Sequence, residues 1–369
     1  MRVCLEYQSA LGPLSGVGRY THQLANALFR DIKNDSLYLY CSDPLKRHGN
    51  KLPLTIPLSS SQLLPYSFAQ KWWNLFNWPG AERIMGDADI YHFPNFTVPP
   101  LKKGKSIVTI HDVVFEKFPE LVEEKNLAYL TRNMAKTLRR ADAIITVSKK
   151  TSLDLNELFG INEDKIVTIY PGITRKEHQL EKGNDSRLIE QLGVNRPFLL
   201  FVSTIEPRKN ISFLIKVFEE LRHFDGELLI VGSFGWKYES VLQSYENSTR
   251  RHSIRFLRYI HDDTLQSLYR KAELFVFPSL YEGFGFPPLE AMLHGTPVIS
   301  STGGALKEVL QGGAVLLDEY DVELWRSTVQ SLIEDTEKRE YWSKKGMDHA
   351  KKFTWEHTAK MQWDVYRGL

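Results

Sequence analysis

Cysteine is scarce in this 369-residue sequence, and metal-ligand spacings of cysteine or histidine are missing from it. Cys4 and Cys41 both lie in short apolar runs, so we expect two free thiols in a reducing compartment. No stretch approaches the roughly 18 apolar residues that cross a membrane, and the apolar run in MRVCLEYQ is too short for a signal peptide. Together these absences predict a cytoplasmic protein that lacks disulfides and has no metal site built from cysteine and histidine.

An excess of charge of either sign is also missing. The 47 lysines and arginines and the 45 aspartates and glutamates give a net charge of +2, and the cations are spread along the chain. Nucleic-acid-binding proteins carry a clustered basic surface, so the sequence argues against a nucleic-acid partner. An apolar content of 42% with 25% charged residues is typical of a folded globular protein. The length suits two domains of ordinary size.

Apolar, strand-like runs alternate with amphipathic, helix-like segments along the chain. Strands are expected at residues 2–8 and 274–277, for example, and helices at 17–30 and 211–221. The run PFLLFV at 197–202 is apolar throughout, as a parallel strand buried on both faces requires. This alternation predicts an α/β protein with two doubly wound parallel sheets.

A loop rich in glycine and aromatic residues follows the expected strand 274–277 and leads into a helix. Its glycines let a ligand approach the backbone closely, and prolines are tolerated in the first helical turn. The free amides of that turn attract phosphate. The carboxylates of Glu282 and Glu290 would accept hydrogen bonds from sugar or ribose hydroxyls. The alternative is an ordinary tight loop with a glutamate that stabilises its helix.

A pair of cations, Arg208 and Lys209, lies in the string TIEPRKN between the strand 197–202 and the helix 211–221. A guanidinium and an ammonium at the carboxyl end of a strand would clamp a diphosphate. They would also stabilise the charge that builds up on a departing nucleoside diphosphate. The alternative from the local sequence is a pair of solvated loop charges.

In the first half of the chain, glycines separate the first expected strand from the first helix. Gly12, Gly16 and Gly18 do not match the G-x-G-x-x-G dinucleotide pattern, but a doubly wound domain accepts ligands at this position. A tight turn without a ligand is the alternative. His111 ends the strand expected at 106–111, where it would bond a sugar hydroxyl or have a purely structural role.

Tryptophans and phenylalanines cluster in the segment LLPYSFAQKWWNLFNWPGAERI. Trp72, Trp73, Phe76 and Trp78 lie there together with basic residues. Such a helix would sit at a bilayer surface or contact a substrate. The alternative is that the tryptophans belong mostly to the hydrophobic core.

The string EGFGFPPLEAMLHGTPVIS, in which seven residues separate Glu282 from Glu290, resembles the paired-glutamate motif of the retaining glycosyltransferases of family 4. TIHDV, GVGRY and TIEPRKN agree with this resemblance. It implies the GT-B fold, in which two Rossmann-like domains face each other across a cleft. The implied boundaries are an acceptor domain at 1–180, a linker at 181–196, a donor domain at 197–353, and a final helix at 354–369 that rejoins the first domain.

The resemblance also implies roles for individual residues. The implied catalytic residues are His111, Arg208, Lys209 and Glu282. The implied donor-binding residues are Gly16, Gly18, Arg208, Lys209, Tyr259, Ile260, Glu282, Gly283, Phe284, Gly285, Phe286, Leu289 and Glu290. Contact with an acceptor or a membrane is assigned to Arg19, Tyr20, Trp72 and Trp73. The chain departs from the family at Arg258, where glycine is common, so the local conformation of the base-binding loop and the identity of the base stay open.

The implied reaction moves a hexose from a nucleotide sugar to an acceptor hydroxyl with retention, without a metal or another cofactor. GVGRY, GSFGWKYE and EGFGFPPLE resemble bacterial mannosyltransferases of surface polysaccharide synthesis, which favours GDP-mannose and a lipid-linked oligosaccharide acceptor at the inner membrane face. Other nucleotide sugars, such as UDP-glucose or dTDP-rhamnose, stay open. So do a non-catalytic sugar-nucleotide-binding subunit and a phosphorylase, although no feature marks a pyridoxal lysine.

Overall fold

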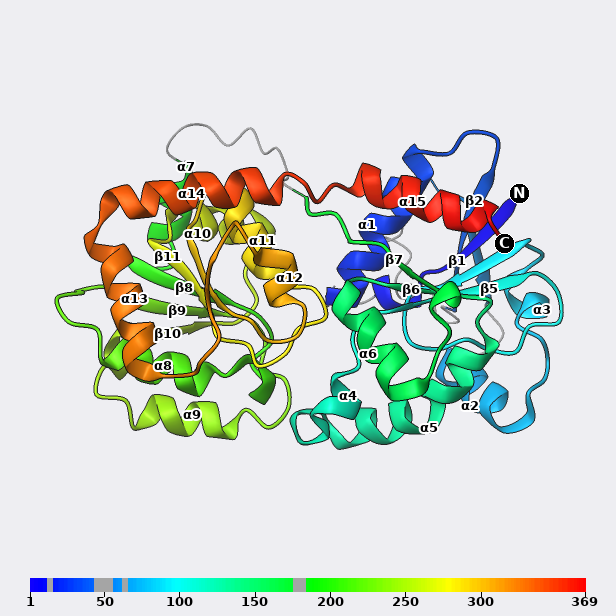
Figure 1. Cartoon of the computed structure of the whole chain (residues 1–369), viewed down its shortest axis with the longest axis horizontal. Coiled ribbons are helices and arrows are strands. Elements are labelled where there is room, and N and C mark those ends of the chain that lie inside the picture. The colour runs from blue at the N-terminus through cyan, green and yellow to red at the C-terminus, as the bar shows by residue number, and fades with distance from the viewer. Residues whose placement is uncertain (12–15, 43–55, 62–65, 175–183) are drawn as a thin grey trace. The chain divides into compact units, whose positions relative to one another are not determined.

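The computed structural model describes residues 1–11, 16–42, 56–61, 66–174 and 184–369, which form two compact units (Figure 1). The first unit contains Met1–Lys117, Glu124–Gly172 and Phe353–Leu369. The second contains Phe118–Glu123 and Ile173–Lys352. Each unit is built around one parallel sheet, which confirms the expected α/β class.

The sheet of the first unit has seven strands in the order β3-β2-β1-β4-β5-β6-β7, and every neighbouring pair is parallel. Most of the strands are short, apolar and buried, because helices cover the sheet. The strands are β1 (Arg2–Glu6), β2 (Ser36–Ser42), β3 (Leu58–Ser61), β4 (Ile90–Phe93), β5 (Lys105–Ile110), β6 (Ala143–Thr146) and β7 (Ile166–Thr168).

The helices of the first unit include one from the end of the chain. They are α1 (Gly16–Arg30), α2 (Tyr66–Phe76), α3 (Glu82–Met85), α4 (Val114–Lys117), α5 (Glu124–Arg140), α6 (Lys149–Phe159) and α15 (Trp355–Arg367). Trp363 of α15 is fully buried and donates its indole N–H to the Leu28 carbonyl of α1, at 3.3 Å. Tyr366 bonds the buried His92 on β4, at 2.7 Å. These contacts join α15 to helix α1 and to strand β4 of the first unit.

The sheet of the second unit has six parallel strands in the order β10-β9-β8-β11-β12-β13. The strands are β8 (Phe198–Val202), β9 (Glu227–Val231), β10 (Ile254–Leu257), β11 (Leu274–Phe277), β12 (Val298–Ser301) and β13 (Val315–Leu317). The helices are α7 (Asn184–Glu190), α8 (Ile211–Glu219), α9 (Glu239–Glu246), α10 (Asp262–Lys271), α11 (Phe286–Leu293), α12 (Leu306–Leu310), α13 (Val322–Glu334) and α14 (Thr336–Ala350). Figure 1 shows α8 and α9 on one side of this sheet and α10, α11 and α14 on the other.

Two segments differ from the sequence-based expectation. The expected linker 181–196 contains helix α7, because the Asp185 carboxylate accepts from Arg270 Nε at 2.8 Å and from the Ser267 hydroxyl at 2.7 Å, both on α10. Residues 181–183 lie outside the described part of the chain. The segment Phe118–Glu123 belongs to the second unit rather than to the first.

Helix α9 begins only at Glu239, because the two residues Trp236 and Lys237 contact another segment of the chain. Lys237 has a φ of 50°, which is incompatible with a helix. The Trp236 indole donates to the Leu121 carbonyl at 2.8 Å, and the Lys237 ammonium donates to the Glu120 carbonyl at 2.8 Å. These bonds hold the segment 118–123 on the second unit.

The strand order reverses at one point in each sheet. In the first sheet β1 lies between β2 and β4, and in the second sheet β8 lies between β9 and β11. Connections leave a doubly wound sheet in opposite directions at such a point, which opens a crevice at the carboxyl ends of the two central strands. The loops after β8 and β11 therefore meet at the ligand-binding position of the second unit.

Candidate active site

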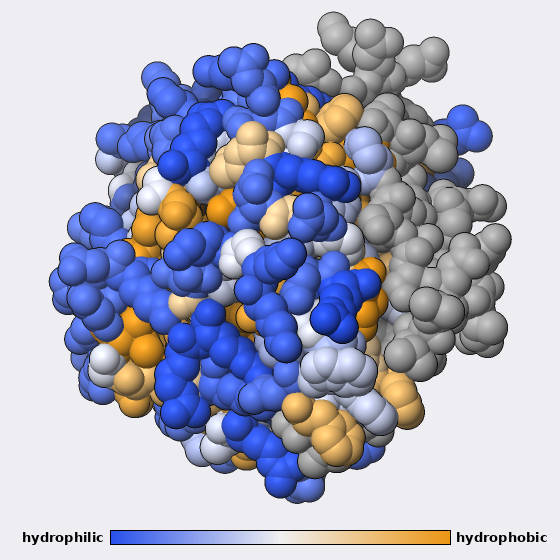
Figure 2. All heavy atoms as spheres, turned by 90° about the vertical axis from the view of Figure 1, so that its right-hand side faces the viewer, coloured by the Kyte–Doolittle hydropathy of each residue, from blue (hydrophilic) through white to orange (hydrophobic). Residues whose placement is uncertain are grey.

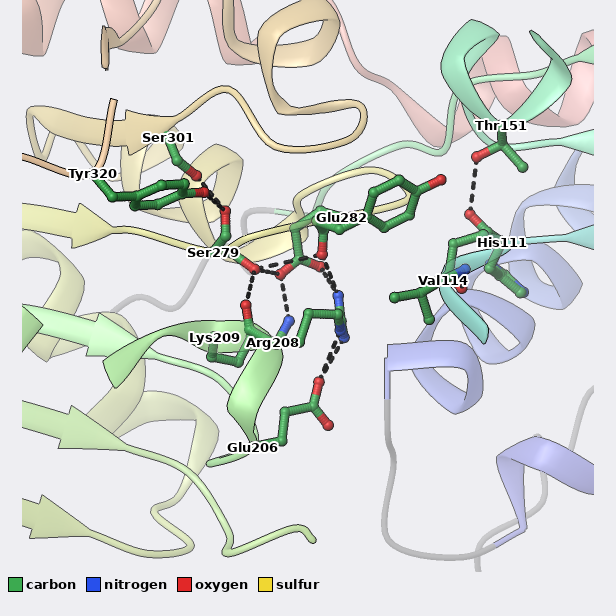
Figure 3. A network of polar contacts seen from close by, with 12 residues as sticks. His111, Val114, Thr151, Glu206, Arg208, Lys209, Ser279, Glu282, Ser301 and Tyr320 are labelled. Carbon is green, nitrogen blue, oxygen red and sulfur yellow. Dashed lines mark hydrogen bonds and ion pairs between the residues drawn. The ribbon is translucent and has the colours of Figure 1, made fainter. Parts of the chain in front are cut away.

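Glu282 lies in the loop after β11, and its carboxylate is the centre of a buried polar cluster (Figure 3). Its side chain is almost fully enclosed, with the residue 9% exposed. One carboxylate oxygen accepts from Arg208 Nη1 at 2.7 Å. The other accepts from Lys209 Nζ at 2.5 Å and from the Ser279 hydroxyl at 2.6 Å. The structure thus brings Glu282 together with the adjacent Arg208 and Lys209, which precede it by more than 70 positions in the sequence.

The charge of Glu282 is set by its surroundings. Burial raises the pKa of a carboxyl group, but here the adjacent Arg208 and Lys209 charges, with hydrogen bonds from Lys209 and Ser279, outweigh burial and lower the pKa to about 2. The group is therefore ionised throughout the neutral range. An ionised carboxylate accepts hydrogen bonds only, so it suits the hydroxyl donors of a sugar.

Lys209 is the most enclosed cation of the cluster, at 5% exposure. Burial and the neighbouring Arg208 charge lower its pKa, while Glu282 and Glu206 act in the opposite sense. The two partners of this ion pair thus both have a lowered pKa, whereas pairing alone would raise that of the lysine. Desolvation of the ammonium explains the difference, because burial disfavours the charged form of a base.

Glu206 completes the cluster and was not predicted from the sequence. It is 2% exposed, and it accepts from Arg208 Nε at 3.0 Å and from Nη2 at 2.7 Å. Two carboxylates therefore face two cations, and both cations follow β8 at the point where the strand order reverses. The only sequence signal is an acidic residue two positions before Arg208, which by itself reads as a solvated loop charge.

The backbone of Glu282 is clamped by a glycine turn after β12. Glu282 donates its amide to the Gly303 carbonyl at 3.3 Å, and its carbonyl accepts from the Ala305 amide at 2.8 Å. Gly304 has a φ of +65°, and a Cβ there would lie 2.3 Å from the Glu282 oxygen. The position therefore requires glycine both for its conformation and for space.

Substitution Gly304→Ala tests this clamp. We expect it to lower the free energy of unfolding of the second unit by about 3 kcal/mol, because the new methyl group collides with backbone atoms. The matched control is Gly193→Ala, at a φ of +70° with nothing within 4 Å of the added Cβ, which should lower it by only about 1 kcal/mol. Urea unfolding followed by hydrogen exchange of second-unit peptides measures both. Equal losses in the two variants would show that the clamp is unimportant.

The loop between Glu282 and α11 has the expected glycine geometry. Gly285 has a φ of +110° and directly precedes the first helical residue, Phe286. Phe284 and Phe286 contact each other edge to face, with ring centroids 5.0 Å apart. Gly283 lies buried in the same loop. The backbone amides at the start of α11 thus follow Glu282 closely in the chain.

Two predicted donor-binding residues of α11 have clear structural partners. Leu289 is fully buried, so its side chain belongs to the hydrophobic core rather than to a ligand surface. Glu290 is half-buried and accepts from the Tyr269 hydroxyl at 3.0 Å. The Tyr269 ring in turn stacks on His294, at 5.8 Å. This bond orients the Glu290 carboxylate.

The predicted base-binding residues follow β10, the edge strand of the second sheet. Tyr259 is 80% exposed and Ile260 is half-buried. Arg258, the departure from the family pattern, places its guanidinium over the Phe234 ring at 5.7 Å. Its side chain therefore has a partner on the neighbouring loop, and Tyr259 presents a large aromatic surface to solvent.

His111 follows β5 in the first unit and is fixed in one tautomer. Its Nε2 lies 2.8 Å from the Pro94 carbonyl, which can only accept, so this nitrogen carries the proton. Burial lowers the pKa of His111, although the bond to Pro94 and the charge of Asp112 oppose the change. The neutral ring then has Nδ1 available as an acceptor. The Tyr20 ring packs edge-on against it, at 4.8 Å.

The glycine segment of the first unit follows β1 as expected. Gly16 is exposed, and an added Cβ there would meet nothing within 4 Å. Gly18 is buried and Arg19 is exposed on α1. Tyr20 is only 1% exposed, so it supports His111 from within the core and is not a surface contact.

The aromatic segment divides between the core and the surface. Trp73 is 2% exposed and donates its indole N–H to the Pro79 carbonyl at 3.0 Å, so its predicted role as a direct acceptor or membrane contact does not fit the structure. Trp72, its neighbour, is 40% exposed. Adjacent residues of a helix point in different directions, which explains why only one of the two reaches solvent.

Comparison with known families accounts for both units. The model "Glycosyl transferases group 1" matches residues 184–349, and the model "Glycosyltransferase Family 4" matches residues 14–177. The two matches together span almost the whole chain. The chain belongs to the glycosyltransferases.

Relatives and solved structures agree with this assignment. The O-antigen chain mannosyltransferase B of Escherichia coli is 28% identical to this glycosyltransferase over 394 aligned residues, with full coverage of both chains. Among solved structures, the sucrose-phosphate synthase of Thermosynechococcus elongatus superimposes with a TM-score of 0.79 at 20% identity, covering 100% of this chain and 98% of its own. The Anabaena protein Alr3699/HepE in complex with UDP-glucose gives a TM-score of 0.74 at 20% identity, with full coverage of both chains. The fold of the glycosyltransferase is therefore GT-B.

Two kinds of feature are absent from the described residues of the glycosyltransferase. They contain no group of three or more histidine, cysteine, aspartate or glutamate side chains arranged to hold a metal ion. Nor does any helix among them have the length and apolar character needed to cross a bilayer.

Proposed function

We propose that this glycosyltransferase moves mannose from GDP-mannose to a sugar hydroxyl of a lipid-linked oligosaccharide, with retention of the anomeric configuration. The observation that carries the proposal is the buried cluster of Arg208, Lys209, Glu206 and Glu282 at the strand-order reversal of the second unit. The choice of mannose rests on the full-length relative from E. coli, which is a mannosyltransferase of O-antigen chains. The reaction then takes place at the cytoplasmic face of the membrane that holds the acceptor.

The cluster is suited to a diphosphate because its cations are held ready by carboxylates. Ion pairs with Glu206 and Glu282 already fix the Arg208 and Lys209 side chains, so these side chains lose little conformational entropy when a ligand binds. A diphosphate that approaches this loop shares the two cations with the carboxylates. Charge that builds up on the leaving group is then stabilised in a site from which water is largely excluded.

The proposed chemistry needs no protein base. The bond between the anomeric carbon and the diphosphate oxygen breaks, and a bond from the acceptor oxygen forms on the same face of the sugar. The acceptor proton passes to the departing diphosphate oxygen, so charge and atoms balance. Arg208 and Lys209 stabilise the diphosphate, and Glu282 accepts hydrogen bonds from the sugar hydroxyls.

Other residues have supporting roles in this proposal. Glu290, oriented by Tyr269, binds the ribose hydroxyls. The neutral His111 ring binds the transferred sugar, and Gly16 leaves room for the phosphates. Residues Tyr259 and Ile260 contact the nucleobase.

A donor screen tests the proposal. We expect GDP-mannose and GDP to raise the melting temperature of the chain more than UDP-glucose, dTDP-rhamnose and their diphosphates, since a ligand bound only by the folded state stabilises it. Slow release of mannose from GDP-mannose should accompany binding. Binding without any release, with or without acceptor, would favour a non-catalytic sugar-nucleotide-binding subunit. Preference for a uridine or thymidine donor would overturn the assignment of GDP-mannose.

Removal of divalent metal should leave the reaction unchanged. The two cations already supply positive charge to the diphosphate, so we expect mannose release in excess EDTA to equal that in magnesium within about twofold. The comparison is made by liquid chromatography of GDP under both conditions. A loss of tenfold or more in EDTA would mean that a metal ion shares the work of Arg208 and Lys209.

A further inference from the structure

Large aromatic side chains are exposed along one face of α2 and just beyond it. Phe68, Trp72 and Phe76 lie four residues apart and are 49%, 40% and 56% exposed, and Trp78 is 51% exposed. The rings of Phe68 and Trp72 are 6.2 Å apart, and those of Trp72 and Phe76 are 4.7 Å apart. We call these four residues the aromatic ridge.

The ridge differs from ordinary surface hydrophobicity. Single exposed apolar residues need no explanation, but contiguous ones mark an interaction site. Figure 2 shows the side of the first unit that lies at the right of Figure 1, where the surface is mainly hydrophilic and hydrophobic residues emerge in small patches. A different face of α2 buries Ala69 and Trp73, so the helix already has its core contact. The ridge is a second apolar face on the same helix.

Cations gather beside the ridge at the C-terminal end of α5. Arg140 bonds both the Asn77 side chain, which lies between Phe76 and Trp78, and the Val98 carbonyl at 2.9 Å. The charges of Arg139 and Arg140 act on Lys136, and Lys165 donates to the Leu138 carbonyl at 2.7 Å. We call this group the basic end of α5; its members are Lys136, Arg139, Arg140 and Lys165.

Stabilisation of helix α5 explains only part of the positive charge at its basic end. Cations are favourable near the C-terminal end of any helix because of its dipole, and Asp142 is paired with Lys105 at 3.2 Å in the same region. Neither effect explains why four aromatic side chains remain exposed in the segment that Arg140 contacts through Asn77. A surface that combines exposed aromatic rings with a basic flank is complementary to an apolar layer with an anionic face.

We propose that the aromatic ridge and the basic end of α5 together bind the surface of an anionic lipid bilayer. Phenylalanine and tryptophan enter the boundary between headgroups and acyl chains, and lysine and arginine attract anionic lipid. The inference deepens the proposed function, on which it rests for its biological reason, since a lipid-linked acceptor is presented at a membrane. The contact is peripheral, because the helix that carries the ridge has only 11 residues.

Vesicle flotation tests the proposal without any transfer reaction. The full chain is mixed with vesicles of phosphatidylethanolamine and phosphatidylglycerol (7:3), or with phosphatidylcholine alone. We expect binding to the anionic vesicles that falls with added salt, and at least about tenfold weaker binding to phosphatidylcholine. The variant Phe68→Ser/Phe76→Ser should bind anionic vesicles at least about tenfold more weakly, and so should Lys136→Glu/Arg139→Glu.

The matched control is Leu153→Ser/Leu158→Ser, which removes two apolar side chains of α6 that are 62% and 40% exposed in the same unit. It should bind vesicles like the native chain. Failure of the native chain to float, or equal flotation of Phe68→Ser/Phe76→Ser, would overturn the proposal. A native dimer in lipid-free solution that this variant alone converts to a monomer would also overturn it, since the ridge would then contact a second copy.

Release of mannose from GDP-mannose in lipid-free buffer separates this inference from the proposed function. The variant Phe68→Ser/Phe76→Ser should retain native release, because the ridge plays no part in donor chemistry. A native chain that floats with anionic vesicles but releases no mannose would overturn the proposed function and leave the membrane surface standing. Normal mannose release without flotation would overturn the membrane proposal and leave the proposed function standing.

Discussion

Substitution of Arg208 by alanine, or of Lys209 by methionine, should lower mannose release from GDP-mannose by about 10²-fold or more. Each change removes one of the two positive charges that would stabilise the departing diphosphate, and loss of one electrostatic stabiliser has effects of this size. Turnover should fall more than GDP affinity, because the negative charge is largest in the transition state. Single-turnover release and GDP titration measure the two quantities.

Arg250→Ala is the matched control for this prediction. Arg250 is also a half-buried arginine of the second unit, but it bonds backbone carbonyls, including those of Phe218 at 3.0 Å and Phe224 at 2.7 Å. Its removal should lower stability and leave turnover per folded molecule close to native. Unchanged turnover in both Arg208→Ala and Lys209→Met would place the diphosphate elsewhere on the molecule.

Substitution Glu282→Gln should reduce both turnover and stability, and the loss of stability should depend on pH. The amide keeps the shape of the carboxyl group but no longer balances Arg208 and Lys209, so the cations shift and turnover falls by about 10²-fold. Because the pKa of Glu282 is lowered from 4.5 to about 2 in the folded chain, the carboxylate contributes about 3 kcal/mol to the free energy of unfolding at neutral pH.

The sign of this contribution defines the experiment. A lowered folded-state pKa gives stability that is fully present above pH 4.5 and is lost as the pH falls toward about 2. The difference in unfolding free energy between the native chain and Glu282→Gln should therefore be constant from pH 7 to 5 and shrink between pH 4.5 and 2. Hydrogen exchange of second-unit peptides reports this unit alone. A difference that does not change with pH would refute the predicted ionisation.

Glu227→Gln controls for the loss of any buried ion pair in the second unit. Glu227 is 7% exposed and pairs with Arg196 at 3.2 Å and with Arg255 at 3.5 Å, away from the loops after β8 and β11. This variant should be less stable than the native chain but should keep its turnover. Loss of turnover equal to that of Glu282→Gln would mean that activity follows the folding of the unit rather than the chemistry of the site.

Much of the architecture and the centre of the site follow from sequence patterns. Apolar runs such as Phe198–Val202 identify buried parallel strands because both faces of such a sheet are covered. Arg208, Lys209 and Glu282 were singled out because they follow expected strands, and the structure shows that the carboxyl ends of these strands meet at a reversal of strand order. Each of these signals can be read from a short stretch of sequence. The rule that ligands bind at the carboxyl ends of the strands of a doubly wound sheet then predicts that the residues lie close together.

The remaining features depend on tertiary contacts that no local pattern records. In the sequence Glu206 resembles any loop carboxylate, and only the structure shows that it accepts a hydrogen bond from Arg208. The polar segment that contains α7 is stabilised as a helix because Asp185 pairs with Arg270 of α10. Trp72 and Trp73 are equivalent by composition, and only the orientation of α2 determines which of them is buried.

The carbonyls of residues 120–122 would be missing if the second half of the chain were expressed alone. A fragment that begins at residue 173 would lack the acceptors of the Trp236 indole and the Lys237 ammonium, although both donors lie in the fragment. Their loss would leave polar groups unmatched and would free residues 236–238 to extend α9 backwards. The second unit is therefore not a contiguous stretch of polypeptide, and a faithful isolated version would have to supply the six residues Phe118–Glu123 as a separate peptide.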